Sequence, residues 1–193
     1  MLEAWSREFP GRDPVAHRLR SAFPSRWVRF HALPESKRYP ADEEELAIVL
    51  GRKNRVLGEL LGSGSQAVLL TTCHSGPGGA IELGRDEEST REFDREARPW
   101  RDVAMHDLDE GFIEPTRWHV RASRWSWRPG LFDPLLRLAA LGEVANVMIV
   151  PPDCRWLFHP YDGGMDVILE STRARDALKA KYAGWLSSRP DGL

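Results

Sequence analysis

The stretch HPYDGGMDVI, from His159 to Ile168, contains residue types that take part in acid–base chemistry and ligand binding. A histidine exchanges a proton near neutral pH, and a neighbouring carboxylate or phenol can orient it. Asp162-Gly163-Gly164 between two apolar runs is also a strong signal for a β-hairpin, with glycines that tolerate positive φ. The turn is the simpler interpretation. The alternative is a ligand site at the hairpin tip that is formed in part by His159, Tyr161, Asp162 and Asp166.

The stretch RFHALPESKRYP contains a second group of polar side chains at a strand end and in the loop that follows it. Lysine and arginine there could hold a phosphate or the carboxylates of a partner. A solvated loop between a strand and a helix is the simpler interpretation. The residues concerned are Arg29, His31, Lys37, Arg38 and Tyr39.

Three expected strands direct Arg, His or Tyr away from their apolar neighbours, because side chains alternate between the two faces of a strand. If these strands are neighbours, they form one polar sheet face with Lys37 and Arg38 at its rim. Asp162 and Asp166 are the nearest carboxylates that could neutralise it. Ordinary solvent exposure is again the simpler interpretation. The candidate ligand- or partner-binding residues are Arg29, His31, Lys37, Arg38, Tyr39, His119, Arg121, His159, Tyr161 and Asp162.

Sequence motifs for several common chemistries are missing. GSGSQ lacks the lysine of a phosphate-binding loop and the second glycine of a serine elbow, and it stands between a helix and a strand, the reverse of both motifs. Cys73 and His74 are adjacent and should point to opposite sides of a strand, which does not fit a zinc site. The sequence therefore predicts no catalytic residue, no cofactor and no metal ligand.

Composition limits the class of protein. The 193 residues carry a net charge of −2, with 41% hydrophobic and 29% charged residues, as in an ordinary soluble domain. Such a charge gives no reason to expect nucleic acid or a membrane as partner. The first ten residues lack the apolar core of a signal peptide, and two cysteines are too few for a disulfide framework. We therefore expect a cytoplasmic protein.

Local patterns predict most elements. Residues 27–33 alternate as a strand, and Asp42 caps a long helix that Gly62 ends. Further strands are expected at 66–73 and 116–127, and a helix begins at Asp133-Pro134. The last third predicts three strands joined by tight turns, followed by a final helix that Ser171 or Thr172 caps.

These elements predict a single α+β domain over residues 1–193. We expect a largely antiparallel sheet with a C-terminal three-stranded meander, and three to four helices packed mainly on one face. Residues 1–13 should form a loosely held arm. Residues 75–115 should form an irregular excursion with a short strand at AIEL (80–83) and a helical turn anchored by Phe93 or Trp100. One common core should contain Leu50, Leu57, Val68, Leu135, Ile149, Val167 and Leu178.

Three stretches resemble a family of small bacterial proteins that are frequent in actinobacteria and similar soil bacteria. The similarity lies in Leu33–Tyr39 (LPESKRY), Trp156–Gly164 (WLFHPYDGG) and Trp127–Leu136 (WRPGLFDPLL). The resemblance covers most of the chain except residues 75–115. The family is labelled a domain of unknown function. The resemblance implies a bacterial, cytoplasmic, single-domain protein and transfers no catalytic residue.

Three hypotheses for the function follow. The first is a non-enzymatic binding or interaction protein, of the immunity or accessory kind, that uses an Arg-, His- and Trp-rich surface. The second is an enzyme or sensor for a small anionic ligand such as a nucleotide, with His31, His119 or His159 as acid–base candidates. The third is a self-associating structural protein whose polar sheet face forms a dimer interface.

Overall fold

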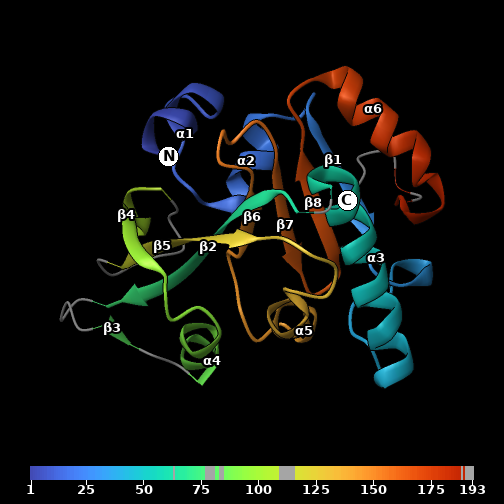
Figure 1. Ribbon diagram of the computed structural model, residues 1–193, viewed down its shortest axis with the longest axis horizontal. Coiled ribbons are helices and arrows are strands. Elements are labelled where there is room, and N and C mark those ends of the chain that lie inside the picture. The colour runs from blue at the N-terminus through green and yellow to red at the C-terminus, as the bar shows by residue number, and fades with distance from the viewer. Residues whose placement is uncertain (63, 77–80, 83–84, 109–115, 188, 190–193) are drawn as a thin grey trace.

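The computed structural model describes residues 1–193 except 63, 77–80, 83–84, 109–115, 188 and 190–193 (Figure 1). Its helices are α1 (Leu2–Glu8), α2 (Ala16–Ala22), α3 (Glu43–Leu61), α4 (Arg85–Phe93), α5 (Asp133–Leu141) and α6 (Thr172–Lys181). Its strands are β1 (Trp27–His31), β2 (Gln66–Ser75), β3 (Ile81–Glu82), β4 (Arg98–Ala104), β5 (Arg117–Ser126), β6 (Met148–Val150), β7 (Leu157–Tyr161) and β8 (Gly164–Ile168).

The strands form one antiparallel sheet in the order β1-β8-β7-β6-β2-β5-β4, with β3 paired to part of β2. Consecutive strands β6, β7 and β8 lie side by side, which confirms the predicted C-terminal meander. Figure 1 shows α3 and α6 beside the β1 end of the sheet and α4 beside the β3 and β4 end. The predicted α+β class is correct.

Both faces of the sheet are covered by helices. On one face, apolar residues of α3, α5 and α6 pack against the sheet in a first core, and Phe93 at the end of α4 packs against the same core. On the other face, Trp5, Phe9 and Leu19 of the α1–α2 region form a second core. Four helices therefore share one face, as predicted, and two cover the other.

The expected common core divides along the same line. Five of the seven residues lie in the first core, namely Leu57, Leu135, Ile149, Val167 and Leu178. Val68 lies in the second core, because it points to the other face of β2. Leu50 is half-buried at the edge of the first core.

The N-terminal segment is not the loosely held arm that the sequence suggested. Residues Leu2–Glu8 form α1, and the side chains of Trp5 and Phe9 are fully buried. The Trp5 indole N–H also donates to the Arg12 carbonyl oxygen at 2.8 Å. Burial of two aromatic side chains, with the indole N–H satisfied, ties this segment to the sheet.

The irregular excursion expected over residues 75–115 contains the expected short strand, as β3, and the expected helical turn, as α4, which ends at Phe93. It is wrong where a further strand, β4, is present. Residues Arg85–Phe93 form α4, and Arg98–Ala104 form β4, which pairs with β5 at the edge of the sheet. The register of β4 shifts between Pro99 and Arg101, and this irregularity removes the alternation by which a strand is recognised. The parts of the prediction that fall on residues 77–80, 83–84 and 109–115 lie outside the described residues.

The predicted hairpin is present, but for a different reason. Tyr161 pairs with Gly164 across a turn formed by Asp162 and Gly163. Neither glycine has a positive φ, so conformational freedom does not explain them. A Cβ at Gly164 would lie 2.2 Å from the Phe30 carbonyl oxygen of β1 and 3.2 Å from the Tyr161 hydroxyl. Gly164 is therefore required by the close approach of its neighbours.

We expect Gly164→Ala to lower the free energy of unfolding by about 1–3 kcal/mol, because the new methyl group must displace the backbone of β1. The matched control is Gly51→Ala in α3, where a Cβ would meet nothing within 4 Å. That change should be neutral or stabilising by up to about 1 kcal/mol. Urea unfolding of both variants measures the difference, and equal stability of the two would contradict the steric explanation.

Candidate functional site

Six of the ten predicted site residues line one recess of about 440 Å³ on the sheet face that carries the second core. They are Arg29, His31, Arg38, His159, Tyr161 and Asp162. The recess is also lined by Asp166 and by two residues of α2, His17 and Arg20. We call this site the Arg–His recess.

Strand register explains why these residues meet. Arg29 of β1 and His159 of β7 both pair with Asp166 of β8, so the three side chains form one row across three strands. His31 and Tyr161 both pair with Gly164 in the next row. Residues paired across strands share a sheet face. Since Gly164 has no side chain, the Tyr161 hydroxyl can lie over it.

Arg29 and Asp166 form a buried ion pair at the floor of the recess. The Arg29 Nε and Nη2 atoms donate to Asp166 Oδ1 and Oδ2 at 2.8 and 3.0 Å, and the two side chains are only 12% and 5% exposed. The guanidinium carbon also lies 5.0 Å from the centre of the Tyr161 ring. The expected neutralisation of Arg29 by Asp166 is thus confirmed, and this guanidinium is held in place rather than free to grasp a ligand.

The two recess histidines of the strands favour their neutral forms. Burial lowers the pKa of His159, and its Nδ1 atom donates to the Val147 carbonyl oxygen at 2.8 Å. Burial, with Arg29 and Arg52 nearby, lowers the pKa of His31. The His31 Nε2 atom is buried and has no hydrogen-bond partner among the described residues. Burial also raises the pKa of Tyr161, which therefore stays a phenol.

The loop residues of the predicted site divide. Arg38 lies at the rim, where its Nε donates to Asp162 Oδ2 at 2.6 Å, so Asp162 neutralises it as expected. Tyr39 is exposed, and a hydrogen bond with Asp162 raises its pKa. Lys37 does not line the recess, because its ammonium group pairs with Glu45 at the start of α3.

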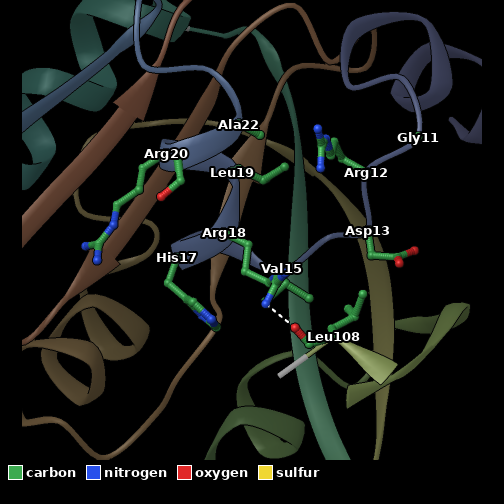
Figure 2. Close-up of a pocket in the computed structure, with 11 residues that line it drawn as sticks. Gly11, Arg12, Asp13, Val15, His17, Arg18, Leu19, Arg20, Ala22 and Leu108 are labelled. Atoms are coloured by element: carbon green, nitrogen blue, oxygen red, sulfur yellow. Dashed lines mark hydrogen bonds between the residues drawn. The ribbon is translucent and has the colours of Figure 1, made fainter. Parts of the chain in front are cut away.

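Arg20 and His17 are recess residues that the sequence analysis missed. They stand three positions apart in α2, on the side away from the buried Ala16 and Leu19, and this spacing is the signal that could have found them. Figure 2 shows the Arg20 side chain directed away from Arg12. In the part of the chain that the structure describes, Arg20 has no carboxylate within ion-pair distance.

A second basic recess, of about 490 Å³, lies along α2 and shares His17 and Arg20 with the Arg–His recess (Figure 2). Arg12 and Arg18 line it, and the Arg18 guanidinium donates to the Leu108 carbonyl oxygen. Asp13 also lines it and pairs with Arg101 at 3.0 Å. Helix α2 therefore has arginine side chains along both of its sides.

His119 and Arg121 do not belong to the Arg–His recess, so the expected single region is wrong for them. In β5 the apolar Val120 points into the second core, which places His119 and Arg121 on the opposite face, toward α4. The prediction assumed that all apolar strand faces share one core, whereas this sheet has two. His119 instead contacts Ser75 and Asp102, and Arg121 donates to the Ala97 carbonyl oxygen at 2.6 Å.

Lys53 is the other residue that the sequence analysis missed. It lies on the apolar stripe of α3, its side chain is fully buried, and its Nζ donates to the Tyr161 carbonyl oxygen at 3.1 Å. Burial lowers its pKa to about 7. The spacing of Lys53 from Val49 and Leu57, four residues on either side, is the signal that could have revealed it.

Among the described residues, no group of three or more His, Cys, Asp or Glu side chains is arranged to hold a metal ion. No helix in the described ranges has the length and apolar character needed to span a membrane.

The family model described as "Domain of unknown function (DUF3885)" matches residues 15–190. No curated protein matches the chain, and no solved structure matches it.

Proposed function

Because the chain belongs to the DUF3885 domain family, whose description assigns no activity, we propose a function from the chain's own residues: a binding protein that holds an anionic group in the Arg–His recess. The group is a phosphate or a carboxylate. It contacts Arg20, with His17 and His31 beside it. This proposal joins the first sequence hypothesis, a binding protein, to the anionic ligand of the second.

The observation that carries this proposal is the charge balance of the recess. Three guanidinium groups and two carboxylates line it, and each carboxylate is already paired. Asp166 is taken by Arg29 and Asp162 by Arg38, which leaves the positive charge of Arg20 without a counterion from the described residues. Such a charge in a partly enclosed recess attracts an anion, because low exposure strengthens electrostatic interactions.

The neutral histidines add a dependence on pH. The His31 Nε2 atom is buried and unpartnered, and the ring forms a hydrogen bond with the Gly163 backbone, so Nε2 can donate to a bound anion once the ring is protonated. A bound anion also favours imidazolium, which raises the pKa of His31 in the complex. The affinity for the anion should therefore increase as the pH falls through the ordinary range of histidine.

Arg20→Ala tests the proposal directly. With inorganic phosphate as the probe, isothermal titration calorimetry should show affinity at least about tenfold weaker than in the wild type, the loss of one charge-assisted hydrogen bond. The matched control is Arg173→Ala on α6, an exposed arginine that should leave the affinity unchanged. Binding should also weaken at high salt.

A second titration distinguishes a phosphate ligand from a carboxylate ligand. Succinate, which supplies carboxylates, is titrated into the same variants. Stronger binding of phosphate points to a phosphorylated ligand, and stronger binding of succinate to a carboxylate ligand. If neither anion binds the wild type, or if Arg20→Ala binds both as well as the wild type does, the proposal is wrong.

We also propose that the protein is cytoplasmic. Cys73 and Cys154 are both buried, and neither forms a disulfide bond in the described part of the chain. Burial raises the pKa of the Cys154 thiol to about 11, which makes it an unreactive thiol. Thiols that are not joined in a disulfide support a reducing compartment such as the cytoplasm.

A further inference from the structure

Three neighbouring strands place a serine, a histidine and an aspartate in a row on the face opposite the Arg–His recess. Ser75 ends β2, His119 lies in β5 and Asp102 lies in β4. Ser75 Oγ is 2.9 Å from His119 Nε2, and His119 Nδ1 is 2.8 Å from Asp102 Oδ1. This is the order of atoms by which a carboxylate orients a base and the base activates a nucleophile.

The strand register holds the row together. His119 pairs with Cys73 of β2 on one side and with Asp102 of β4 on the other. Ser75 is two residues beyond Cys73, so its side chain emerges on the same face. The three side chains are thus fixed by rigid strands rather than by loops, which favours a constant geometry.

The hydrogen bonds select the productive tautomer. An ionised carboxylate can only accept, so His119 donates its Nδ1 proton to Asp102. The Nε2 lone pair then faces Ser75, whose hydroxyl donates to it. Ser75 is thereby positioned to lose its proton to His119 as its oxygen attacks.

A recess of about 300 Å³ lies at the edge of β2, and it is lined by Cys73, the residue of β2 that pairs with His119. Strand β6 pairs with β2 only as far as Leu70, and β3 pairs only from His74. The edge between them opens into the recess, whose lining combines small apolar residues such as Val144 and Ala145 with polar residues that include Glu143 and Asn146. Ser75 itself is 3% exposed and the His119 side chain 24%, so the nucleophile and the base are largely screened from water, whereas the Asp102 side chain at the sheet edge is 60% exposed. Such a space suits a short acyl chain.

We propose that Ser75 and His119 hydrolyse small acyl esters, with Asp102 as the positioning residue. Ser75 Oγ bonds to the carbonyl carbon while its proton passes to His119 Nε2. His119 returns that proton to the departing alkoxide, which leaves as an alcohol and gives acyl-Ser75. Water then attacks the acyl carbon, and its proton passes through His119 to Ser75 Oγ as the carboxylic acid leaves. Gly76 follows the nucleophile, where serine hydrolases place a backbone N–H that stabilises the oxyanion.

A fluorophosphonate probe tests the nucleophile on the full chain. We expect covalent labelling of the wild type, mapped to Ser75 by peptide mass spectrometry, and none in Ser75→Ala. His119→Ala should slow labelling by at least about 100-fold, the size of a lost general base. The matched control is Ser123→Ala, another buried serine, which donates to Asp94 and contacts no histidine in the described part of the chain. It should label at the wild-type rate.

Catalytic measurements on folded variants distinguish a role of Asp102 in positioning His119 from a role in stabilising the fold. Hydrolysis of p-nitrophenyl acetate should fall by at least about 100-fold in kcat for Asp102→Asn, since asparagine favours the wrong tautomer. Asp102→Glu should restore part of this loss. Circular dichroism confirms folding of each variant.

The proposal is overturned if folded wild type is neither labelled at Ser75 nor faster than Ser75→Ala in hydrolysing the ester. It is also overturned if Asp102→Asn acts at the wild-type rate. Because this row shares no residue with the Arg–His recess, either result leaves the proposal on anion binding unaffected.

Discussion

Arg29→Met is expected to lower the free energy of unfolding by about 3–5 kcal/mol, the cost of leaving one member of a buried ion pair without its partner. Asp166 is 5% exposed and accepts two hydrogen bonds from Arg29, so its carboxylate would remain buried and uncompensated. The substitution also removes the contact between the guanidinium and the Tyr161 ring. Urea unfolding at neutral pH measures the loss.

The double variant Arg29→Met with Asp166→Leu separates charge from packing. Replacing a buried ion pair by apolar residues of similar size is often neutral or stabilising, so the double variant should recover most of the lost stability. The single variant should also recover at acidic pH, because a buried carboxylate without a partner has a raised pKa and its cost disappears once it is protonated. A single variant that loses less than about 1 kcal/mol would contradict a buried, uncompensated charge at Asp166.

We expect Lys53→Met to stabilise the protein at low pH and to destabilise it at high pH. Burial lowers the pKa of Lys53 from 10.5 to about 7. Between these two values the unfolded chain binds more protons than the folded protein, so the contribution of Lys53 to stability rises with pH from about 7 to about 10. Below pH 7 the buried ammonium costs about 4–5 kcal/mol, from 1.36 kcal/mol per pKa unit.

Methionine removes this cost but leaves the Tyr161 carbonyl without its donor, which costs about 1–3 kcal/mol. The variant should therefore be more stable than the wild type at pH 6 and less stable at about pH 10. Thermal unfolding across this range, with the exposed Lys179→Met as control, measures the crossover. Parallel pH profiles for wild type and Lys53→Met would show that Lys53 keeps its ordinary pKa in the folded protein.

Local signals predicted much of the fold. The Asp42 side chain accepts from the Glu45 N–H at 2.9 Å, as the capping pattern implied, and Gly62 ends α3 with a positive φ. The hairpin and the meander were readable because their turns and strands lie close together in the sequence. The sequence did not predict α1 or β4, because the burial of Trp5 and the pairing of β4 depend on residues that are distant in the sequence.

Most residues of the candidate site could be predicted from the sequence, but the sheet face on which each of them lies could not always be. Arg29, His31 and His159 could be placed together because each of them lies on the face of its strand opposite the apolar residues of the first core. His119 was misplaced because alternation gives two faces but does not say which core each one meets. Arg20 was missed because a short helix with charged residues on its outer side resembles any solvated helix.

An NMR titration of the histidine rings tests the binding of an anion in the Arg–His recess most directly. The chain has six histidines, of which His17, His31 and His159 line the recess. Titration of the wild type with inorganic phosphate, followed by ¹H–¹³C NMR of the rings, should shift these three. The remaining three, His74, His106 and His119, should stay unchanged. Shifts spread evenly over all six rings, or no saturable shift at all, would contradict anion binding in the recess.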